Sequence, residues 1–163
     1  MTTTTSEITL ECLVYDAETS AGAYRLVDED SRFLRVVEGS TPVPQGGVVR
    51  RTRGTVLYDS GPVEPGATLF VALFPVPAEA TEEFDAWFIE EHSQLLLDHE
   101  DWLRARLVEL PGGRFSRLVI HDLANADVLL SPHRAAAGQT ERTRVALAGD
   151  WPAGAVRYTA NQA

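Results

Sequence analysis

One segment of the chain, Thr81 to Leu97 (TEEFDAWFIEEHSQLLL), limits the fold most strongly, because its apolar residues follow the spacing of an α-helix. These apolar residues are Phe84, Trp87, Phe88, Leu95 and Leu96. His92 comes four residues after Phe88 and therefore falls on the same face, which we expect to be buried. A histidine in this place is a candidate acid or base, and a hydrogen-bonded core histidine is the alternative.

The second half of the chain alternates strands and helices around this segment. The pattern predicts a strand over 68–76, a helix over 81–99, and strands over 102–110 and 115–122. A second helix follows over 124–138, which Pro132 breaks or delays, and final strands lie near 144–147 and 156–159. The order β-α-β-β-α-β is that of a ferredoxin-like α+β unit, whose two helices cover one face of an antiparallel sheet. The other face needs a cover from another subunit or from elsewhere in the chain.

The first half of the chain has a β pattern without helical periodicity. We expect a polar tail over 1–6, a β-rich half over 7–60, a linker over 61–66 (GPVEPG) and the ferredoxin-like half over 67–163. All of them should form one compact unit. The β-rich half is either an all-β extension or a degenerate repeat, and it could cover part of the bare sheet face.

Composition excludes several classes of function. The net charge of −10 argues against binding to nucleic acid or to an anionic membrane surface. No apolar run is long enough to span a bilayer, and the N-terminus lacks the pattern of a secretory signal, so we expect a cytoplasmic protein. All 14 basic residues are arginine, which excludes Schiff-base chemistry through lysine and a P-loop. Cys12 is the only cysteine, which excludes an intramolecular disulfide and a cysteine-based zinc site. We therefore expect neither a metal nor an organic cofactor.

Two runs of the sequence resemble a known group. FDAWFIEEHSQLL resembles the histidine-bearing helix of the dimeric α+β barrel superfamily, especially its EthD-like branch, and LLSPHRAAAGQTERTRV is similar to the Ser-Pro and Thr-rich tail of that group. The resemblance covers residues 67–158. The sequence departs from the pattern of that group at Phe88, where a tyrosine is common, and at Ser93-Gln94, where a hydrophobic residue and a proline are usual.

The resemblance implies a barrel of packed sheets but does not choose a reaction. Members of the superfamily include cofactor-free isomerases, lactone-forming enzymes, polyketide cyclases, cofactor-independent monooxygenases and heme-dependent enzymes. By the same resemblance His92 would be a proton shuttle, while heme ligation through one histidine stays open. The uncovered sheet face leads us to expect a homodimer, although the barrel could instead close within one chain.

The strand over 115–122 supplies a second set of candidates. Alternation places Arg117 and His121 on one face and Leu118 and Ile120 on the other. We expect Leu118 and Ile120 to face the helices and the two basic residues to face the barrel interior. A guanidinium there can stabilise an enolate or carboxylate, and a neutral imidazole can move a proton near pH 7.

These patterns define one candidate site in a mostly apolar cavity. The candidate catalytic residues are His92, His121 and Arg117. The candidate substrate-binding residues are Phe74, Trp87, Phe88, Trp102, Arg104 and Arg106. Pairing with surface acids is the alternative for the last two, and we expect His99 and His133 to lie at the surface.

Three functions fit this site. The first is a cofactor-independent enzyme of secondary metabolism that uses acid–base chemistry to cyclise, isomerise or dehydrate a hydrophobic carbonyl or aromatic substrate. The second is a cofactor-independent monooxygenase acting on a phenolic substrate. The third is a non-catalytic protein that binds a small hydrophobic ligand.

Overall fold

The computed structural model of the protein describes residues 6–14, 23–27, 32–39 and 48–162, and within them eight strands form a closed barrel in the order β1-β3-β2-β8-β5-β7-β6-β4. The strands are β1 (Glu7–Val14), β2 (Tyr24–Leu26), β3 (Arg32–Glu38), β4 (Val48–Asp59), β5 (Thr68–Phe74), β6 (Trp102–Glu109), β7 (Arg117–Leu123) and β8 (Val156–Gln162). Every strand pairing that closes the barrel is antiparallel. The barrel therefore closes within one chain.

The two halves of the barrel repeat the same strand order. Strands of the second half lie in the order β8-β5-β7-β6, and strands of the first half lie in the equivalent order β4-β1-β3-β2. The halves join through β2 with β8 and β4 with β6, which are equivalent junctions. In its strand topology the first half is thus a repeat of the second, and it takes the place that a second subunit would hold.

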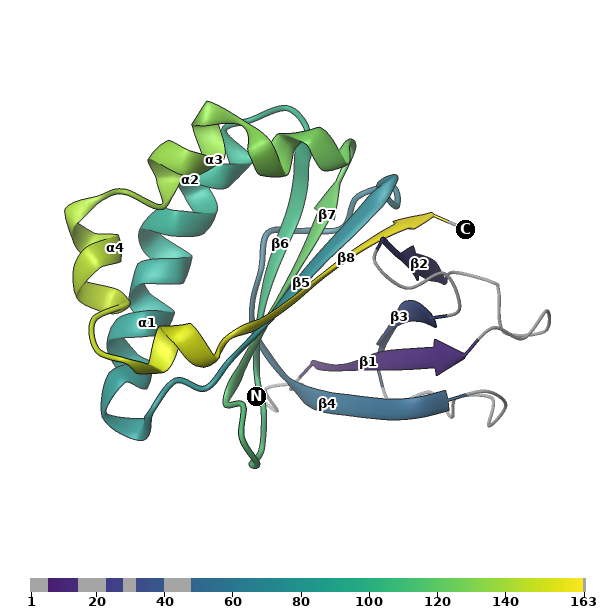
Figure 1. Ribbon diagram of the computed structural model, residues 1–163, viewed down its shortest axis with the longest axis horizontal. Coiled ribbons are helices and arrows are strands. Elements are labelled where there is room, and N and C mark those ends of the chain that lie inside the picture. Colours follow the sequence, from purple (N-terminus) through teal and green to yellow (C-terminus); the bar gives the residue numbers. More distant parts are fainter. Residues whose placement is uncertain (1–5, 15–22, 28–31, 40–47, 163) are drawn as a thin grey trace, which may run out of the picture.

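The helices belong to the second half and lie on one side of β5–β8, away from β1–β4 (Figure 1). A first helical segment consists of α1 (Thr81–Trp87), a π-helical turn (Phe88–His92) and α2 (Ser93–Leu97). The second contains α3 (Pro132–Ala137) and α4 (Glu141–Ala146). Short 3-10 turns lie at Ala78–Ala80, Ala126–Leu130 and Trp151–Gly154. In the first half, the chain between β1 and β2 and between β3 and β4 lies mostly outside the described residues.

Two layers of apolar side chains hold the fold together. The barrel interior is filled from both halves, with Ile8, Leu34, Leu118 and Ile120 among the buried residues. A second layer of side chains, which includes Phe84, lies between the helices and the outer face of the sheet. Strand β5 contributes to both layers and is buried at every position, as its near-continuous apolar sequence predicts.

The order of elements predicted for the second half is confirmed except at its end. The prediction of a strand near 144–147 is wrong, because these residues belong to α4 and its C-terminal end. Thr140 caps this helix by accepting a hydrogen bond from the Thr143 amide. The predicted second helix starts late, as Pro132 suggested, since Pro132 occupies the first helical turn and Ser131 is its N-cap.

The assignment of the two faces of β7 is wrong. Leu118 and Ile120 point into the barrel, where they meet Ile8 of the first half. His121 instead packs against Phe70 and Phe88 on the helical side. Alternation correctly separated the two sets, but both faces of this strand are buried, so the pattern alone did not show which face the helices cover.

Most of the predicted tail over 1–6 lies outside the described residues. Residues 61–66, where we predicted a linker, have no regular secondary structure. In the described part of the chain, no helix has the length and apolar character needed to cross a bilayer.

Candidate functional site

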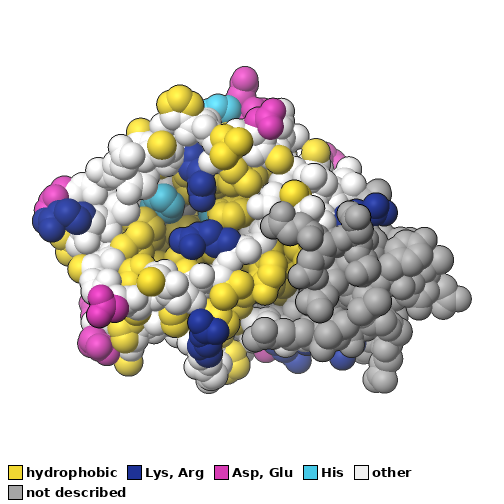
Figure 2. Space-filling view, in the orientation of Figure 1, with side chains coloured by type: hydrophobic (Ala, Val, Ile, Leu, Met, Phe, Trp, Pro, Cys, Tyr) yellow, Lys and Arg dark blue, Asp and Glu magenta, His cyan; other side chains and the backbone are white. Residues whose placement is uncertain are grey.

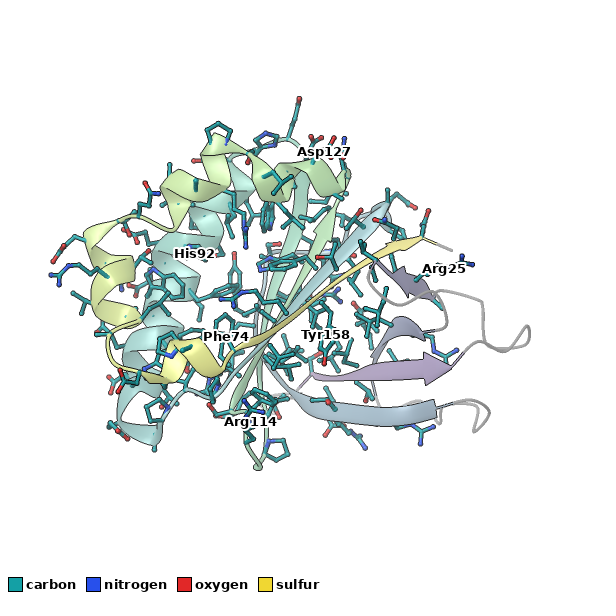
Figure 3. The ribbon with its side chains drawn as sticks, in the orientation of Figure 1. Arg25, Phe74, His92, Arg114, Asp127 and Tyr158 are labelled. Atoms are coloured by element: carbon teal, nitrogen blue, oxygen red, sulfur yellow. The ribbon has the colours of Figure 1, made fainter. Side chains whose placement is uncertain are left out.

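A cavity of about 400 Å³ lies between the helical layer and the outer face of the sheet. Its wall includes Phe70, Ala72, Phe74, Val119 and His121 from the sheet, Trp102 from the start of β6, and Trp87, Phe88, His92 and Leu96 from the helical segment. Figure 2 shows a hollow with apolar walls, a histidine and basic side chains, whereas acidic side chains lie on the outer surface around it. In Figure 3, His92 lies on the helical side of this space and Phe74 lies on the sheet.

The π-helical turn gives the helical wall its shape. In a regular α-helix, residues five apart point about 140° away from one another. Here the rings of Trp87 and His92, five residues apart, stack with centroids 4.4 Å apart and planes inclined by 24°. The extra residue in the turn therefore brings this indole and this imidazole to one face, where both line the cavity.

Side chains that come after the histidine stabilise this turn. The Ser93 amide donates to the Phe88 carbonyl, which is the five-residue hydrogen bond of a π-helix. The Ile89 carbonyl accepts from Ser93 Oγ at 3.3 Å and from Gln94 Nε2 at 3.1 Å. Ser93-Gln94 is the pair at which the sequence departs from the pattern that it resembles, and a proline at position 94 would lack the amide side chain that completes these contacts.

His92 is held as a neutral ring with one free nitrogen. Its Nδ1 lies 3.2 Å from the carbonyl of Ala137 in α3, so Nδ1 carries the proton that it donates to this oxygen. Burial lowers the pKa of His92 to about 4, against the opposing effect of that hydrogen bond. The ring is therefore neutral at pH 7, and Nε2 has a lone pair that can accept a proton.

His121 is held in the opposite tautomer. The indole N–H of Trp102 donates to its Nδ1 at 3.0 Å, so the proton of the neutral ring is on Nε2. The side chain is 3% exposed, and burial is the main reason why its pKa falls to about 3, with the positive form of His92 contributing next. Phe70 stacks on the ring at 5.8 Å and fixes its plane.

The structure thus brings His92 and His121 to a common cavity, as predicted, with complementary chemistry. One ring offers a proton acceptor and the other a hydrogen-bond donor, and both are neutral. The predicted aromatic residues Phe74, Trp87, Phe88 and Trp102 also line this cavity. A base beside a fixed donor can remove a proton and stabilise the oxygen on which charge develops.

Arg117 does not belong to the cavity. Its guanidinium makes two hydrogen bonds to Asp85 of α1, at 2.7 and 2.9 Å, and lies 3.6 Å from Glu109. Hydrogen bonding to Asp85 raises the pKa of Arg117 further. The prediction that this guanidinium points into the site is wrong, because it joins the first helix to the sheet.

Arg104 and Arg106 also lie outside this cavity, on the other face of the sheet from His121. Arg104 makes a two-pronged contact with Asp59, and Arg106 bridges Glu38 and the buried Asp122. The alternative that both arginines pair with acids is therefore confirmed. His133 contacts the Leu95 carbonyl and packs against the ring of His99, away from the cavity wall.

The sequence patterns missed part of the cavity wall. Phe70 could have been found, because it alternates with Phe74 on β5. Arg134 of α3, Arg157 of β8 and Thr143 of α4 carried no such signal, although Thr143 accepts a hydrogen bond from the indole of Trp87 at 2.9 Å. The places of Arg134 and Thr143 depend on how the second helical segment packs, and that of Arg157 depends on the pairing of β8 with β5.

Metal binding is not favoured by the side chains around the cavity. Across the described ranges, no three histidine, cysteine or acidic side chains converge on one point. A zinc ion would need three or four such ligands.

No protein-family model matches the chain, and no curated protein matches its sequence. Solved structures do match it over nearly its whole length. A ferredoxin-fold protein from Listeria monocytogenes, related to antibiotic biosynthesis monooxygenases, has a TM-score of 0.64 at 12% identity, covering 98% of this chain and 95% of that chain. An anthrone oxidase-like protein has a TM-score of 0.62 at 14% identity, covering 98% and 92%.

A heme-degrading enzyme from Listeria monocytogenes has a TM-score of 0.62 at 11% identity, covering 96% of this chain and 99% of that chain. These likenesses include the first sixty residues, which the sequence resemblance left out. At such identities they show the fold alone. The chain thus shares a ferredoxin-like α+β fold with these structures, and both halves of its barrel lie in one polypeptide.

Proposed function

We propose that the protein is an enzyme that binds a flat, hydrophobic molecule in the cavity and removes a proton from it with His92. The observation that supports this most directly is the pair of neutral imidazoles with opposite tautomers at one apolar cavity. The aromatic wall suits a substrate with fused or conjugated rings. The narrower likeness to the EthD-like branch, which rests on residues 84–96, is part of this proposal.

The reaction is determined by the two ring nitrogens. His92 Nε2 takes the proton from an acidic C–H or O–H group of the substrate, and the electron pair moves onto the substrate oxygen. His121 Nε2–H donates a hydrogen bond to this oxygen, and the low polarity of the cavity strengthens the interaction. The substrate anion stabilises the new imidazolium, which offsets the low pKa of the free ring. Return of the proton to another carbon completes an isomerisation. In a cyclisation the substrate anion attacks a carbonyl carbon of the same molecule, whose oxygen then takes the proton, and in a dehydration a hydroxyl group leaves and takes the proton to form water.

A cofactor-independent monooxygenase is the second candidate, and the names of two similar structures favour it. One protein is related to antibiotic biosynthesis monooxygenases, and the other is anthrone oxidase-like. The first step would be the same proton removal from a phenol or an anthrone, after which the electron-rich substrate anion reacts with dioxygen. The two candidates therefore share deprotonation and differ only in the fate of the substrate anion.

Heme is not part of this proposal, because a cavity of about 400 Å³ suits a substrate of two or three fused rings. Independence of cofactors remains a prediction, and a Soret band in the purified protein would contradict it.

Hydrogen–deuterium exchange into anthrone tests the proposed step directly. In deuterated buffer without oxygen, the protein should accelerate exchange at the acidic carbon, and His92→Gln should reduce this acceleration by about 10²–10⁴-fold. His133→Gln is the matched control, because His133 lies outside the cavity wall. Repeating the assay in air separates the two candidates, since a monooxygenase should form anthraquinone well above the spontaneous rate of anthrone oxidation measured without protein.

Unchanged exchange in a folded His92→Gln sample would refute the role of His92. If both cavity histidines can be replaced without loss of ligand affinity and no exchange is catalysed, the protein is a binding protein.

A further inference from the structure

Two arginines that the candidate reaction does not use lie at the cavity. Arg134 comes from α3 and Arg157 from β8, so they approach the cavity from the helical layer and from the sheet. The guanidinium of Arg134 lies 5.3 Å from the ring centroid of Phe70, and that of Arg157 lies 5.7 Å from the ring centroid of Phe74. Both rings line the cavity, so each contact holds a positive charge over its wall.

Neither arginine has an acidic partner among the described residues. Arg104, Arg106 and Arg117 each bind carboxylates elsewhere in the fold. The Arg134 guanidinium donates to the Leu129 carbonyl at 3.0 Å, and the described residues of the cavity wall include no aspartate or glutamate. In a chain with 24 acidic and 14 basic residues, two cations left together without an acid need another source of negative charge.

The surroundings make this arrangement unfavourable without a ligand. Arg134 is half-buried, and burial lowers its pKa, with the positive charge of Arg157 acting in the same direction. An anion between the two guanidinium groups would remove both effects. Arginine is suited to this role because its planar donors match the oxygens of a carboxylate or a phosphate.

We propose that the ligand of this cavity is an aromatic oxyanion, whose carboxylate or phosphate group binds between Arg134 and Arg157 while its ring system lies against the aromatic wall. This inference rests on the proposed function, in which the ring system of the substrate lies beside His92 and His121. The inference adds that the substrate is negatively charged and that its charged group binds the two arginines. The atoms that react still lie beside the histidines.

Calorimetric titration with matched naphthalene probes tests this proposal. 2-Naphthoate and 2-naphthyl phosphate carry the anionic group, and 2-naphthamide has nearly the shape of the carboxylate without its charge. We expect at least one anionic probe to bind about tenfold tighter than the amide at low salt, with the advantage shrinking as salt is added. The better anion identifies the source of the oxyanion.

Arg157→Gln and the double variant Arg134→Gln/Arg157→Gln should reduce and then abolish this advantage while leaving amide binding unchanged. Arg144→Gln is the matched control, because Arg144 is an exposed arginine that pairs with Glu141 outside the cavity. Arg157 is itself exposed on β8, so its replacement preserves the core even if the double variant is less stable.

Equal affinities of wild-type protein for all three probes, no binding of any probe, or an advantage that survives the double variant would each overturn the oxyanion proposal. Anthrone carries no anionic group, so its exchange by His92 can be observed even if the naphthalene probes show no advantage for an anion. The opposite result is also possible. If the arginine variants lose the preference for the anion while His92→Gln exchanges anthrone normally, only the proposed function is rejected.

Discussion

His92 and His121 each use one ring nitrogen for a structural hydrogen bond, and both side chains line the cavity. The Ala137 carbonyl fixes the proton of His92 on Nδ1, and the indole of Trp102 fixes the proton of His121 on Nε2. Neither partner would be found from the sequence spacing, because they lie 45 and 19 residues away from the histidines they orient. The chemistry of each ring therefore depends on contacts that only the folded chain provides.

The low pKa values of these rings predict how activity and stability depend on pH. With folded values of about 4 for His92 and about 3 for His121, both rings should stay neutral well below the ordinary value of 6.5. Proton removal by His92 should thus persist to about pH 5 and fall near pH 4. Nitrogen NMR should show opposite tautomers at pH 7 and no protonation of either ring at pH 5.5.

The same two rings affect the free energy of unfolding. The unfolded chain binds more protons than the folded chain between pH 6.5 and the folded pKa values, so the stabilisation is complete above pH 6.5 and is lost as pH falls toward 4 and 3. His92→Gln should therefore flatten the loss of stability between pH 7 and pH 4.5 in denaturant titrations. A curve parallel to that of wild type would contradict the lowered pKa of His92.

At the scale of single residues, the sequence identified the histidines and the aromatic wall but misplaced the arginines. Helical phase and strand alternation brought His92 and His121 to one cavity, because both patterns are local. Arg117, Arg104 and Arg106 were assigned to the cavity because strand alternation does not distinguish two buried faces. Partner carboxylates from distant segments, such as Asp85 for Arg117, decided their positions.

The helical segment from Thr81 to Leu97 was predicted as one continuous α-helix, and its π-helical turn is the feature that this prediction lacked. The apolar residues before and after the turn fit a spacing of 3.6 residues, so periodicity gave no sign of an extra residue. The turn depends on contacts of Ser93 and Gln94 with the Ile89 carbonyl. Such side-chain contacts decide between an α and a π turn without changing the hydrophobic pattern.

Deletion of Glu90 tests whether the turn acts as one inserted residue. Glu90 is exposed within the turn, and its deletion should leave a regular α-helix in which Trp87 and His92, now four residues apart, stay within about 40° of one another. We therefore expect a folded protein that retains anthrone exchange. Glu90→Ala is the matched control, since it keeps the length of the turn and loses only the surface pair with Arg142. A loss of exchange of about 100-fold or more in the deletion variant alone would show that the π turn itself is needed.

For the whole molecule, the repeated strand order explains why one chain is enough to build the barrel. The first half supplies the strands that cover the inner face of β5–β8. Among the described residues, helices cover only the outer face of β5–β8. The sequence predicted the β-rich half and its covering role, but the order of its strands depends on long-range pairing.

The closed barrel changes what can be expected of the assembly. The uncovered sheet face was our reason to expect a homodimer, and strands of the same chain cover that face. Gly54 shows how closely the junction is built, because a Cβ atom there would lie 2.3 Å from the Glu109 carbonyl oxygen across the β4–β6 pairing. The barrel therefore needs no strands from a second copy, and any dimer would form through another surface.

Thermal unfolding at different protein concentrations tests this conclusion. If the barrel core is complete within one chain, Tm should stay constant over a hundredfold range of concentration, because unfolding then releases no partner. Gly54→Val is a useful companion variant, since its side chain would force β4 away from β6 and should lower Tm strongly at every concentration. A Tm that rises steadily with concentration would show that a second chain contributes to the stability of the barrel, and light scattering would then give the size of the assembly.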